Sequence, residues 1–251
     1  MTRIILHGCS GHMGHVVAEI AAQDPDLSIV AGLDAVDDDT RPFPVYIDKK
    51  DCTEEADAVV DFSTAKAVDS LLDYCVERKL PLVLCTTGLT EEQLAKVREA
   101  SGEIAILRSA NMSLGINTIL KLTAEAAKVL YPAGFDIEVE EMHHRRKLDA
   151  PSGTALLLAD GIRGALDEEV DYVYDRSARS MARPKAEIGI SSLRGGTVVG
   201  EHEVVFAGQD EVIRISHSAF SRAIFAKGAA AAAKFLAGKP AGLYTMSDVI
   251  G

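Results

Sequence analysis

The sequence predicts an α/β protein whose first domain is a doubly wound parallel sheet and whose second domain is of the α+β class with a mixed sheet. Two observations support this. The first third of the chain alternates short apolar strands with helical patterns. After Ser113 this alternation stops, and a long helical pattern is followed by strand-like segments joined through glycines. A chain of 251 residues is long enough for two domains with separate cores.

The first domain is expected to consist of short apolar strands connected by helices. The expected strands are 3–7, 27–33, 58–62, 82–84 and 104–107, and the expected helices are 16–22, 66–78 and one ending near Ser101. Thr90 and Gln93 have the spacing of a capping box for the last of these helices. An alanine-rich helix that ends at Ala237, with Ser221 as its expected cap, returns the chain to this domain. We therefore expect the first domain to comprise 1–113 and 223–251.

The second domain is expected to span 114–222. Helices are expected over 114–130 and 153–166, and strands over 135–142, 186–194, 198–207 and 211–216. The last three strands are joined through Gly195-Gly196 and Gly208, which predicts an antiparallel or mixed sheet. The polar stretch 167–183 is expected to be irregular and mobile.

Composition limits the classes of partner. The formal net charge is −12, which argues against nucleic acid, since phosphate binding requires a basic face. No apolar stretch approaches the roughly 20 residues of a membrane span, and the N-terminal apolar run is too short for a signal peptide. The four cysteines show no paired or metal-binding spacing, so we expect reduced thiols. These features predict a cytoplasmic protein with no membrane or nucleic-acid partner.

A glycine motif indicates a nucleotide site. Gly8, Gly11 and Gly14 form GxxGxxG, directly after an expected strand, before an expected helix, and twenty residues before Asp34 at the end of the next strand. Glycines allow the backbone to approach a pyrophosphate at the helix N-terminus, and Asp34 can accept hydrogen bonds from ribose hydroxyls. A purely structural turn with a coincidental aspartate is the alternative. The context favours a Rossmann-type dinucleotide-binding domain.

The residue after the second strand also bears on the choice of cofactor. The carboxylate of Asp34 repels a 2′-phosphate, and Ala35 offers no cation to compensate. His12 and His15 lie near the expected phosphates, but either is equally consistent with a surface position. We expect NADH to be preferred over NADPH.

Two further loops follow expected parallel strands. They carry small and hydroxyl residues suited to a nicotinamide and its ribose, although each alone is also compatible with an ordinary turn. The loops contain Cys85, Thr86 and Thr87, and Ala110, Asn111, Met112 and Ser113.

The most informative segment is EEMHHRRKLDAPSGTA at 140–155. Imidazoles, guanidiniums and an ammonium are concentrated between His143 and Lys147 of an acidic chain, and a helix start at Gly153 and Thr154 follows. Positive charge next to titratable imidazole and a helix N-terminus suits a small dianionic substrate that must be protonated. A solvated basic loop is the alternative.

The order of motifs resembles the 4-hydroxy-tetrahydrodipicolinate reductase (dihydrodipicolinate reductase) family over nearly the whole chain. The matching segments are GCSGHMG at 8–14, DFST at 61–64, TTG at 86–88, ANMSLGIN at 110–117, EEMHHRRKLDAPSGTA at 140–155 and VGEHEVVFAG at 199–208. The resemblance implies an NAD(P)H-dependent reductase of lysine and diaminopimelate biosynthesis, with a cyclic dicarboxylate substrate. It also implies a substrate domain whose sheet builds a homotetramer.

The resemblance also implies roles for individual residues. His143 corresponds to the acid/base histidine, His144 to a substrate contact, and Lys147 to a substrate-binding lysine that donates a proton. Gly153 and Thr154 correspond to the site of a substrate carboxylate. The cofactor residues implied are Gly8, Cys9, Ser10, Gly11, His12, Met13, Asp34, Cys85, Thr86, Thr87, Ala110, Asn111, Met112 and Ser113. Cys85 stands where glycine is usual in this family, and His12 stands where arginine is common. Both departures bear on the affinity for the cofactor and on the preference between NADH and NADPH.

Other readings of these residues remain open. The adjacent His143 and His144 suggest a metal site, but neighbours on a strand point to opposite faces and the following cations repel a metal. A Rossmann oxidoreductase acting on sugars and a non-catalytic NAD-binding sensor are further alternatives. His7, His202 and His217 are expected to be structural, and a position at an interface is an open alternative for His202.

Overall fold

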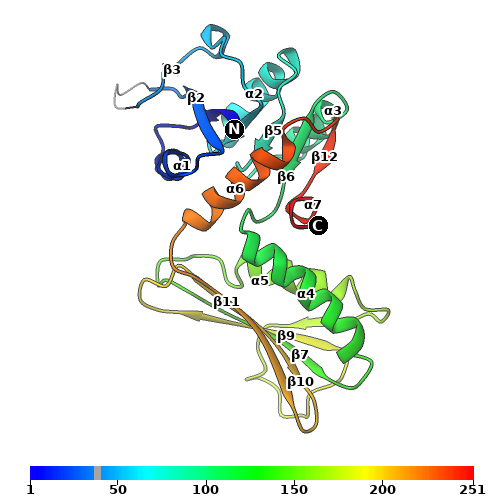
Figure 1. Cartoon of the computed structure of the whole chain (residues 1–251). Helices are drawn as coiled ribbons and strands as arrows, with labels where there is room; N and C mark the ends of the chain where they lie inside the picture. The colour runs from blue at the N-terminus through cyan, green and yellow to red at the C-terminus, as the bar shows by residue number, and fades with distance from the viewer. Residues whose placement is uncertain (37–40) are drawn as a thin grey trace. The chain divides into compact units, whose positions relative to one another are not determined.

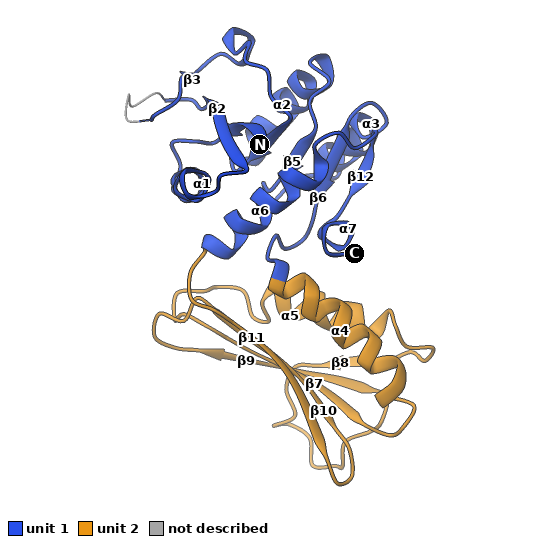
Figure 2. Ribbon diagram, in the orientation of Figure 1, with its two compact units in different colours: residues 1–114, 223–251 blue, residues 115–222 orange. Residues whose placement is uncertain are grey.

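The computed structural model describes residues 1–36 and 41–251, and this described chain divides into two compact units (Figures 1 and 2). Unit 1 comprises 1–114 and 223–251, and unit 2 comprises 115–222. Among the described residues, none of the helices combines the length and apolar character needed to cross a membrane.

Unit 1 is built on a parallel sheet. The seven strands that it contains among the described residues follow the order β12-β6-β5-β4-β1-β2-β3, and each neighbouring pair is parallel. The strands are β1 (Thr2–His7), β2 (Leu27–Leu33), β3 (Val45–Tyr46), β4 (Ala58–Asp61), β5 (Leu82–Leu84), β6 (Ala105–Arg108) and β12 (Gly242–Tyr244). The helices are α1 (His12–Gln23), η1 (Lys49–Asp51), α2 (Ala65–Glu77), α3 (Glu91–Ala100), α6 (Ala223–Leu236) and α7 (Met246–Ile250).

Both faces of this sheet are covered, as the alternation of side chains in β1 illustrates. Ile4 and Leu6 are buried with the apolar residues of α1 and α6, whereas Ile5 points to the other face and packs with those of α2. A strand buried on both faces must be apolar throughout, which explains the continuous run. The doubly wound parallel sheet expected from sequence is confirmed.

Unit 2 contains a mixed sheet with helices on one face. Its described strands follow the order β11-β10-β7-β9-β8, in which β7 pairs antiparallel with β10 and parallel with β9. The elements are α4 (Leu114–Leu130), β7 (Asp136–His143), α5 (Gly153–Arg163), β8 (Asp171–Val173), β9 (Glu187–Arg194), β10 (Gly200–Ala207) and β11 (Val212–Ala219). The apolar residues of α4 and α5 form one core with those of the strands. The expected mixed sheet is confirmed, but β7 separates β9 from β10, which follow one another in sequence.

Several element boundaries differ from the sequence-based expectations. The first helix begins at His12 because the glycine turn leads into it directly, and α5 already ends at Arg163 with Gly164 as its C-cap. The strands β3 and β12 are too short to produce a recognisable pattern. The expected capping box of α3 is present, with Thr90 and Gln93 as partners.

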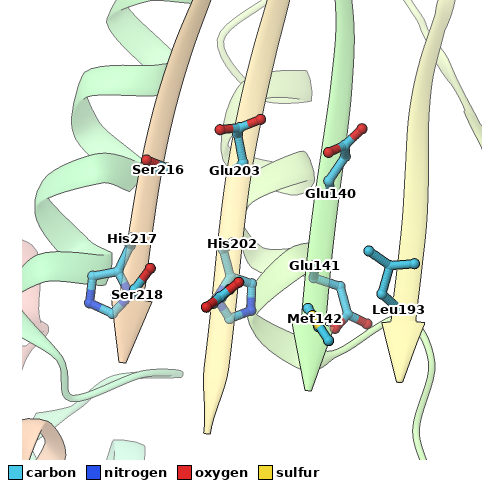
Figure 3. A pocket seen from close by; sticks show the side chains of 10 residues that line it. Glu140, Glu141, Met142, Leu193, His202, Glu203, Ser216, His217 and Ser218 are labelled. Carbon is cyan, nitrogen blue, oxygen red and sulfur yellow. The ribbon is translucent and has the colours of Figure 1, made fainter. Parts of the chain in front are cut away.

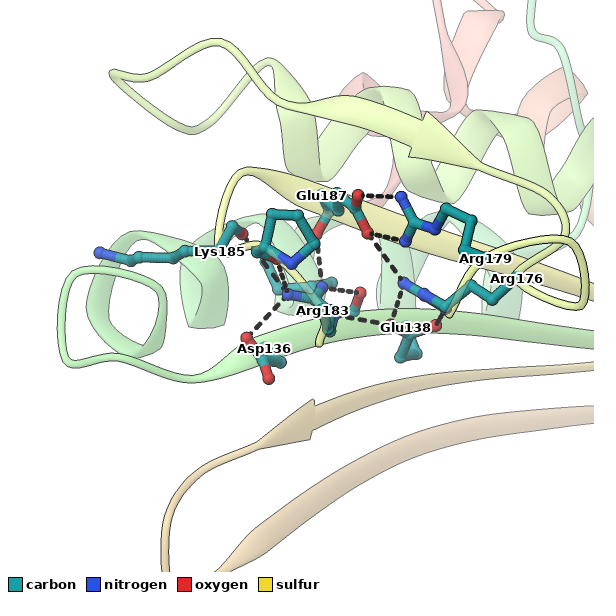
Figure 4. A network of polar contacts seen from close by, with 9 residues as sticks. Asp136, Glu138, Arg176, Arg179, Arg183, Lys185 and Glu187 are labelled. Carbon is teal, nitrogen blue, oxygen red and sulfur yellow. Dashed lines mark hydrogen bonds and ion pairs between the residues drawn. The ribbon is translucent and has the colours of Figure 1, made fainter. Parts of the chain in front are cut away.

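The expectation of an irregular segment over 167–183 is wrong in part, since the segment contributes β8. Arginines in it form ion pairs with carboxylates of β7 and β9 (Figure 4). Arg176 donates both terminal nitrogens to Glu138, and Arg179 donates both of its own to Glu187. Arg183 binds the Asp136 carboxylate at 2.7 Å. These pairs tie the segment to the sheet, and a polar composition alone does not predict them.

Candidate active site

The glycine motif of unit 1 forms a turn that tolerates no side chain. Gly8 has φ +80°, and a Cβ at this position would lie 2.7 Å from the carbonyl oxygen of Phe62. A Cβ on Gly14 would overlap the carbonyl oxygen of Gly8. Helix α1 follows with Gly11 as its N-cap and no side-chain cap. A helix N-terminus of this kind, closely approached by glycine backbone, is suited to a pyrophosphate.

Asp34 lies at the carboxyl end of β2 and is held by two amides. Its Oδ2 accepts from the Ser10 N–H at 2.8 Å, and its Oδ1 accepts from the Ala35 N–H at 2.7 Å. The carboxylate therefore lies against the glycine turn, as ribose recognition requires. A cation not expected from the sequence also lies in this region, because the Arg41 guanidinium is 2.8 Å from the His15 ring nitrogens.

The loops after β5 and β6 lie at the same edge of the sheet as the glycine turn, because the strands are parallel. The Thr86 hydroxyl donates to Asp61 Oδ2 at 2.6 Å, and His7 Nδ1 lies 2.7 Å from Asp61 Oδ1. Burial opposes ionisation of Asp61, but the bonds from His7 and the neighbouring donors keep its pKa below the usual range. In the second loop, the Ser113 N–H donates to Asn111 Oδ1 at 2.8 Å.

These residues fit a nicotinamide dinucleotide. The expected phosphate, ribose and nicotinamide contacts all lie in unit 1, in the turn after β1, at the end of β2 and in the loops after β5 and β6. Gly11 and His12 are exposed at the start of α1, whereas Cys9 and Met112 are buried. The side chains of Cys9 and Met112 therefore pack in the core beneath their loops, and these two residues can offer a ligand only their backbone groups.

In unit 2, His143 is the last residue of β7 and forms a buried pair with Glu141. His143 Nδ1 lies 2.6 Å from Glu141 Oε2, with the His143 side chain 10% exposed and that of Glu141 0%. Arg194 donates to both Glu141 oxygens at 2.8 and 2.7 Å. Burial opposes ionisation of Glu141, but the bonds from Arg194, His143 and other donors lower its pKa to about 2. The carboxylate is thus an anion at neutral pH.

The N-terminus of α5 joins the same network. Its N-cap, Ser152, donates its N–H to Glu141 Oε1 at 3.1 Å and accepts at Oγ from the Ala155 N–H at 3.2 Å. The His202 Nε2 lies 3.1 Å from this hydroxyl, and the His202 ring is edge-on to His143 with centroids 5.1 Å apart. Gly153, the first helical residue, is exposed.

His202, expected to be structural, is 5% exposed, and its ring contacts the Ser152 hydroxyl. Burial and then the neighbouring His143 lower its pKa to about 4, so it is neutral at neutral pH. Figure 3 shows His202 between Glu141 and His217 on adjacent strands. The alternation of VGEHEVVF predicts the strand but not which face is covered.

The basic residues after β7 lie in a turn with different exposures. Arg145 and Arg146 are exposed, and His144 is half-buried. The Lys147 Nζ forms an ion pair with Asp149 Oδ2 at 2.9 Å, and Arg194 donates to the Asp149 carbonyl at 2.7 Å. The charge of Lys147 also contributes to lowering the pKa of His202.

In the described part of the chain, no group of three or more His, Cys, Asp or Glu side chains is arranged to hold a metal ion. The cysteines, all of which fall in the described ranges, are unpaired.

A parallel sheet covered on both faces, with a glycine turn at its edge, defines a protein of the Rossmann-type dinucleotide-binding class, and its second unit carries a buried imidazole–carboxylate pair. The sequence profile of the N-terminal domain of dihydrodipicolinate reductases matches residues 2–112, and that of their C-terminal domain matches residues 115–250. The chain belongs to the dihydrodipicolinate reductase family, which confirms the resemblance noted from its motifs.

Curated relatives support this assignment. The chain is 56% identical over 252 residues to the 4-hydroxy-tetrahydrodipicolinate reductase of Caldanaerobacter subterraneus subsp. tengcongensis, covering 100% of this chain and 98% of that protein. It is 48% identical to the reductase of Clostridium tetani, with coverage of 100% and 97%.

A solved structure has the same fold. The dipicolinate-bound dihydrodipicolinate reductase from Paenisporosarcina sp. TG-14 superposes with a TM-score of 0.83 at 23% identity, with both chains covered completely. This likeness confirms a parallel sheet followed by a second domain with a mixed sheet.

Proposed function

We propose that this protein transfers hydride from NAD(P)H to 4-hydroxy-tetrahydrodipicolinate, giving tetrahydrodipicolinate for lysine and diaminopimelate biosynthesis. The observation that carries the proposal is the buried pair of His143 and Glu141, bonded through Ser152 to the N-terminus of α5. This arrangement supplies a proton-transferring group and a site for a carboxylate within one network. Membership of the reductase family supports the same reaction.

The substrate is a cyclic dicarboxylate whose reduction leaves a carbanion-like enamine to be protonated. The reduced nicotinamide supplies the hydride when bound. His143 then delivers a proton from Nε2 while Glu141 holds Nδ1, and such positioned proton transfer contributes roughly 10²–10⁴-fold. Histidine suits this step because its ordinary pKa lies near neutrality.

The substrate carboxylates need fixed donors. We propose that the first turn of α5, with Gly153 and the Thr154 hydroxyl, binds one carboxylate, since the helix macrodipole favours an anion at a helix N-terminus. Lys147, which we also propose as a proton donor, binds a carboxylate by exchanging its bond to Asp149. The Asp149 side chain is 59% exposed. Because an exposed ion pair contributes only about 0–1 kcal/mol to stability, breaking this pair costs little free energy. His144 is proposed as an additional substrate contact.

The cofactor is proposed to bind to unit 1 through the turn 8–13, Asp34 and the loops 85–87 and 110–113. NADH is proposed as the preferred form because the Asp34 carboxylate is fixed at the end of β2, where it repels a 2′-phosphate. Arg41 moderates this preference, so NADPH is also accepted.

A homotetramer in the cytoplasm is proposed for the assembled enzyme. In the described chain, α4 and α5 pack with apolar residues on one face of the sheet of unit 2. Glu140, Glu203 and Ser216 line a shallow pocket on the sheet (Figure 3). Subunits would associate through the face of the sheet opposite these helices.

The test is an assay of reduced-nucleotide oxidation, with the unstable substrate generated by a coupled synthase. We expect oxidation that depends on the synthase and a higher kcat/KM with NADH than with NADPH. A cyclic polyol assayed with NAD⁺ serves as the control for a sugar dehydrogenase. Absence of synthase-dependent oxidation would overturn the proposed reaction, and an equal or better efficiency with NADPH would overturn only the nucleotide preference.

A further inference from the structure

We infer that Glu141, clamped by Arg194, is the positioning residue for His143 and couples this imidazole to the carboxylate-binding start of α5. This inference rests on the proposed function, in which His143 is the proton donor. Glu141 itself need not touch substrate or cofactor, since it acts through the two groups it holds.

Several donors fix the orientation of the Glu141 carboxylate, and the Ser192 side chain is one of them. Oε2 accepts from His143 Nδ1 at 2.6 Å and from one terminal nitrogen of Arg194 at 2.8 Å. Oε1 accepts from the Ser152 N–H at 3.1 Å and from the other terminal nitrogen at 2.7 Å. A buried carboxylate with two donors on each oxygen can neither rotate nor lose a partner without a large penalty.

The bond to Glu141 determines which nitrogen of His143 exchanges protons. A neutral imidazole carries one N–H, and a carboxylate that accepts at Nδ1 places the hydrogen there. Nε2 is then the acceptor in the neutral ring and the donor in the protonated ring. A Cβ on Gly200 would lie 3.0 Å from Nε2, so glycine keeps the adjacent strand clear of this atom.

The same carboxylate sets the position of α5. Ser152 is bonded to Glu141 through its N–H and caps the helix through its hydroxyl, so the helix start and the imidazole share one anchor. Arg194 extends the anchor to the loop that carries Lys147, because it also donates to the Asp149 carbonyl. Groups that must meet one small substrate are thus held at fixed separations before it binds, as efficient catalysis requires.

The neighbouring glutamate provides a matched control. Glu140 has the same charge and lies on the same strand, but its exposed side chain points to the opposite face of the sheet. If negative charge on β7 were sufficient, the two glutamates would be equivalent. If Glu141 positions His143, only Glu141 matters to turnover.

The experiment compares Glu141→Gln, Glu141→Asp and Glu140→Gln in the full-length protein. We expect Glu141→Gln to lower kcat about 10- to 100-fold, by analogy with the loss of a carboxylate that orients a metal-bound imidazole. The KM for the reduced nucleotide should stay within about twofold, and Glu141→Asp should recover part of kcat. Glu140→Gln, shown by size-exclusion chromatography to keep the wild-type oligomeric state, should match the kcat of the wild type. A folded Glu141→Gln protein with wild-type kcat would overturn the inference.

A second readout does not depend on activity or on the folding of Glu141→Gln. Nitrogen-15 NMR of the wild-type imidazoles, with His143 assigned from His143→Gln, reports which ring nitrogen carries the hydrogen. The Nδ1–H form is expected, and an Nε2–H form would contradict the inference. If the wild type shows no reductase activity, the proposed function fails, whereas the ring form still decides the positioning role.

Discussion

Among the described residues, each unit contains a buried imidazole bonded through Nδ1 to a carboxylate, and the two pairs are held differently. In unit 1, the Asp61 partner of His7 is supported by neutral donors, the Thr86 hydroxyl and the Ser63 N–H. In unit 2, the Glu141 partner of His143 is clamped by the charged guanidinium of Arg194. The distance from the imidazole Nδ1 to the carboxylate oxygen is nearly the same in the two pairs, at 2.7 Å for His7 and 2.6 Å for His143.

The difference lies in what each carboxylate connects. Asp61 joins the end of β1 to the loop after β5, so it shapes backbone that is expected to contact the cofactor. Glu141 joins an imidazole at a strand end to the first turn of a helix. An imidazole–carboxylate pair is therefore not itself a sign of catalysis, and the groups beyond it indicate its role.

The largest expected effect concerns acid stability. The Glu141 pKa falls from 4.5 to about 2 on folding, so its stabilisation is full above about pH 5 and is lost as the pH falls toward 2. This shift corresponds to on the order of 3 kcal/mol. Urea unfolding followed by circular dichroism at several pH values should show a fall in wild-type unfolding free energy below pH 5. Glu141→Gln should make the unfolding free energy depend less on pH in this range. An unchanged pH dependence would show that folding does not lower the pKa of Glu141.

Loss of the Lys147 ammonium should have the next largest effect. Lys147→Ala should lower kcat/KM for the dicarboxylate about 10- to 100-fold, since a charge-assisted hydrogen bond contributes about 1.5–3 kcal/mol. Arg146→Ala, an exposed neighbour, is the control and should change it less than about threefold. Wild-type kinetics in Lys147→Ala would place the ammonium outside the substrate site.

Asp61→Asn tests the other side of the comparison. The neutral amide should hold His7 and Thr86 less firmly, so the KM for the reduced nucleotide should rise about tenfold, as expected for one weakened buried hydrogen bond. Turnover at saturating nucleotide should change little. A fall in kcat similar to that of Glu141→Gln would mean that the two pairs share one role.

The smallest expected effect is that of Arg41. Arg41→Ala should lower kcat/KM for NADPH about three- to fivefold and leave that for NADH within about twofold, since an exposed charge contributes 0.2–1 kcal/mol. Steady-state kinetics with both nucleotides measures this ratio. An equal loss of kcat/KM with NADH and NADPH would mean that Arg41 maintains the shape of the glycine turn and does not discriminate between the two nucleotides.

Sequence patterns predicted most of the fold because its central strands are continuous apolar runs and its helices have clear starts. Thr90 and Gln93 are an example, since their capping box appears as expected. Strands of two or three residues, such as β3 and β12, produce no such pattern. In the sheet, β9 and β10 lie on either side of β7. This order depends on which strands pair, and the glycine turns between strands do not determine it.

The candidate site was predicted where its residues are neighbours in sequence. His143, Lys147 and the start of α5 lie within one motif, and the structure places His143 and the helix start in one network. The side chain of Arg194 reaches Glu141 from another strand, fifty-three residues away, so no local pattern indicates it. The sequence did not indicate Arg41 near the glycine turn for the same reason, because its proximity to His15 depends on the path of the loop after β2.

The most direct test of the account compares kcat for His143→Gln and His7→Gln at saturating substrate and nucleotide. The account predicts that His143→Gln lowers kcat by about 10²–10⁴-fold with KM values within a few-fold. Folded His7→Gln should keep kcat within about tenfold of the wild type. Near-normal turnover in His143→Gln would contradict the assignment of this imidazole as the proton donor.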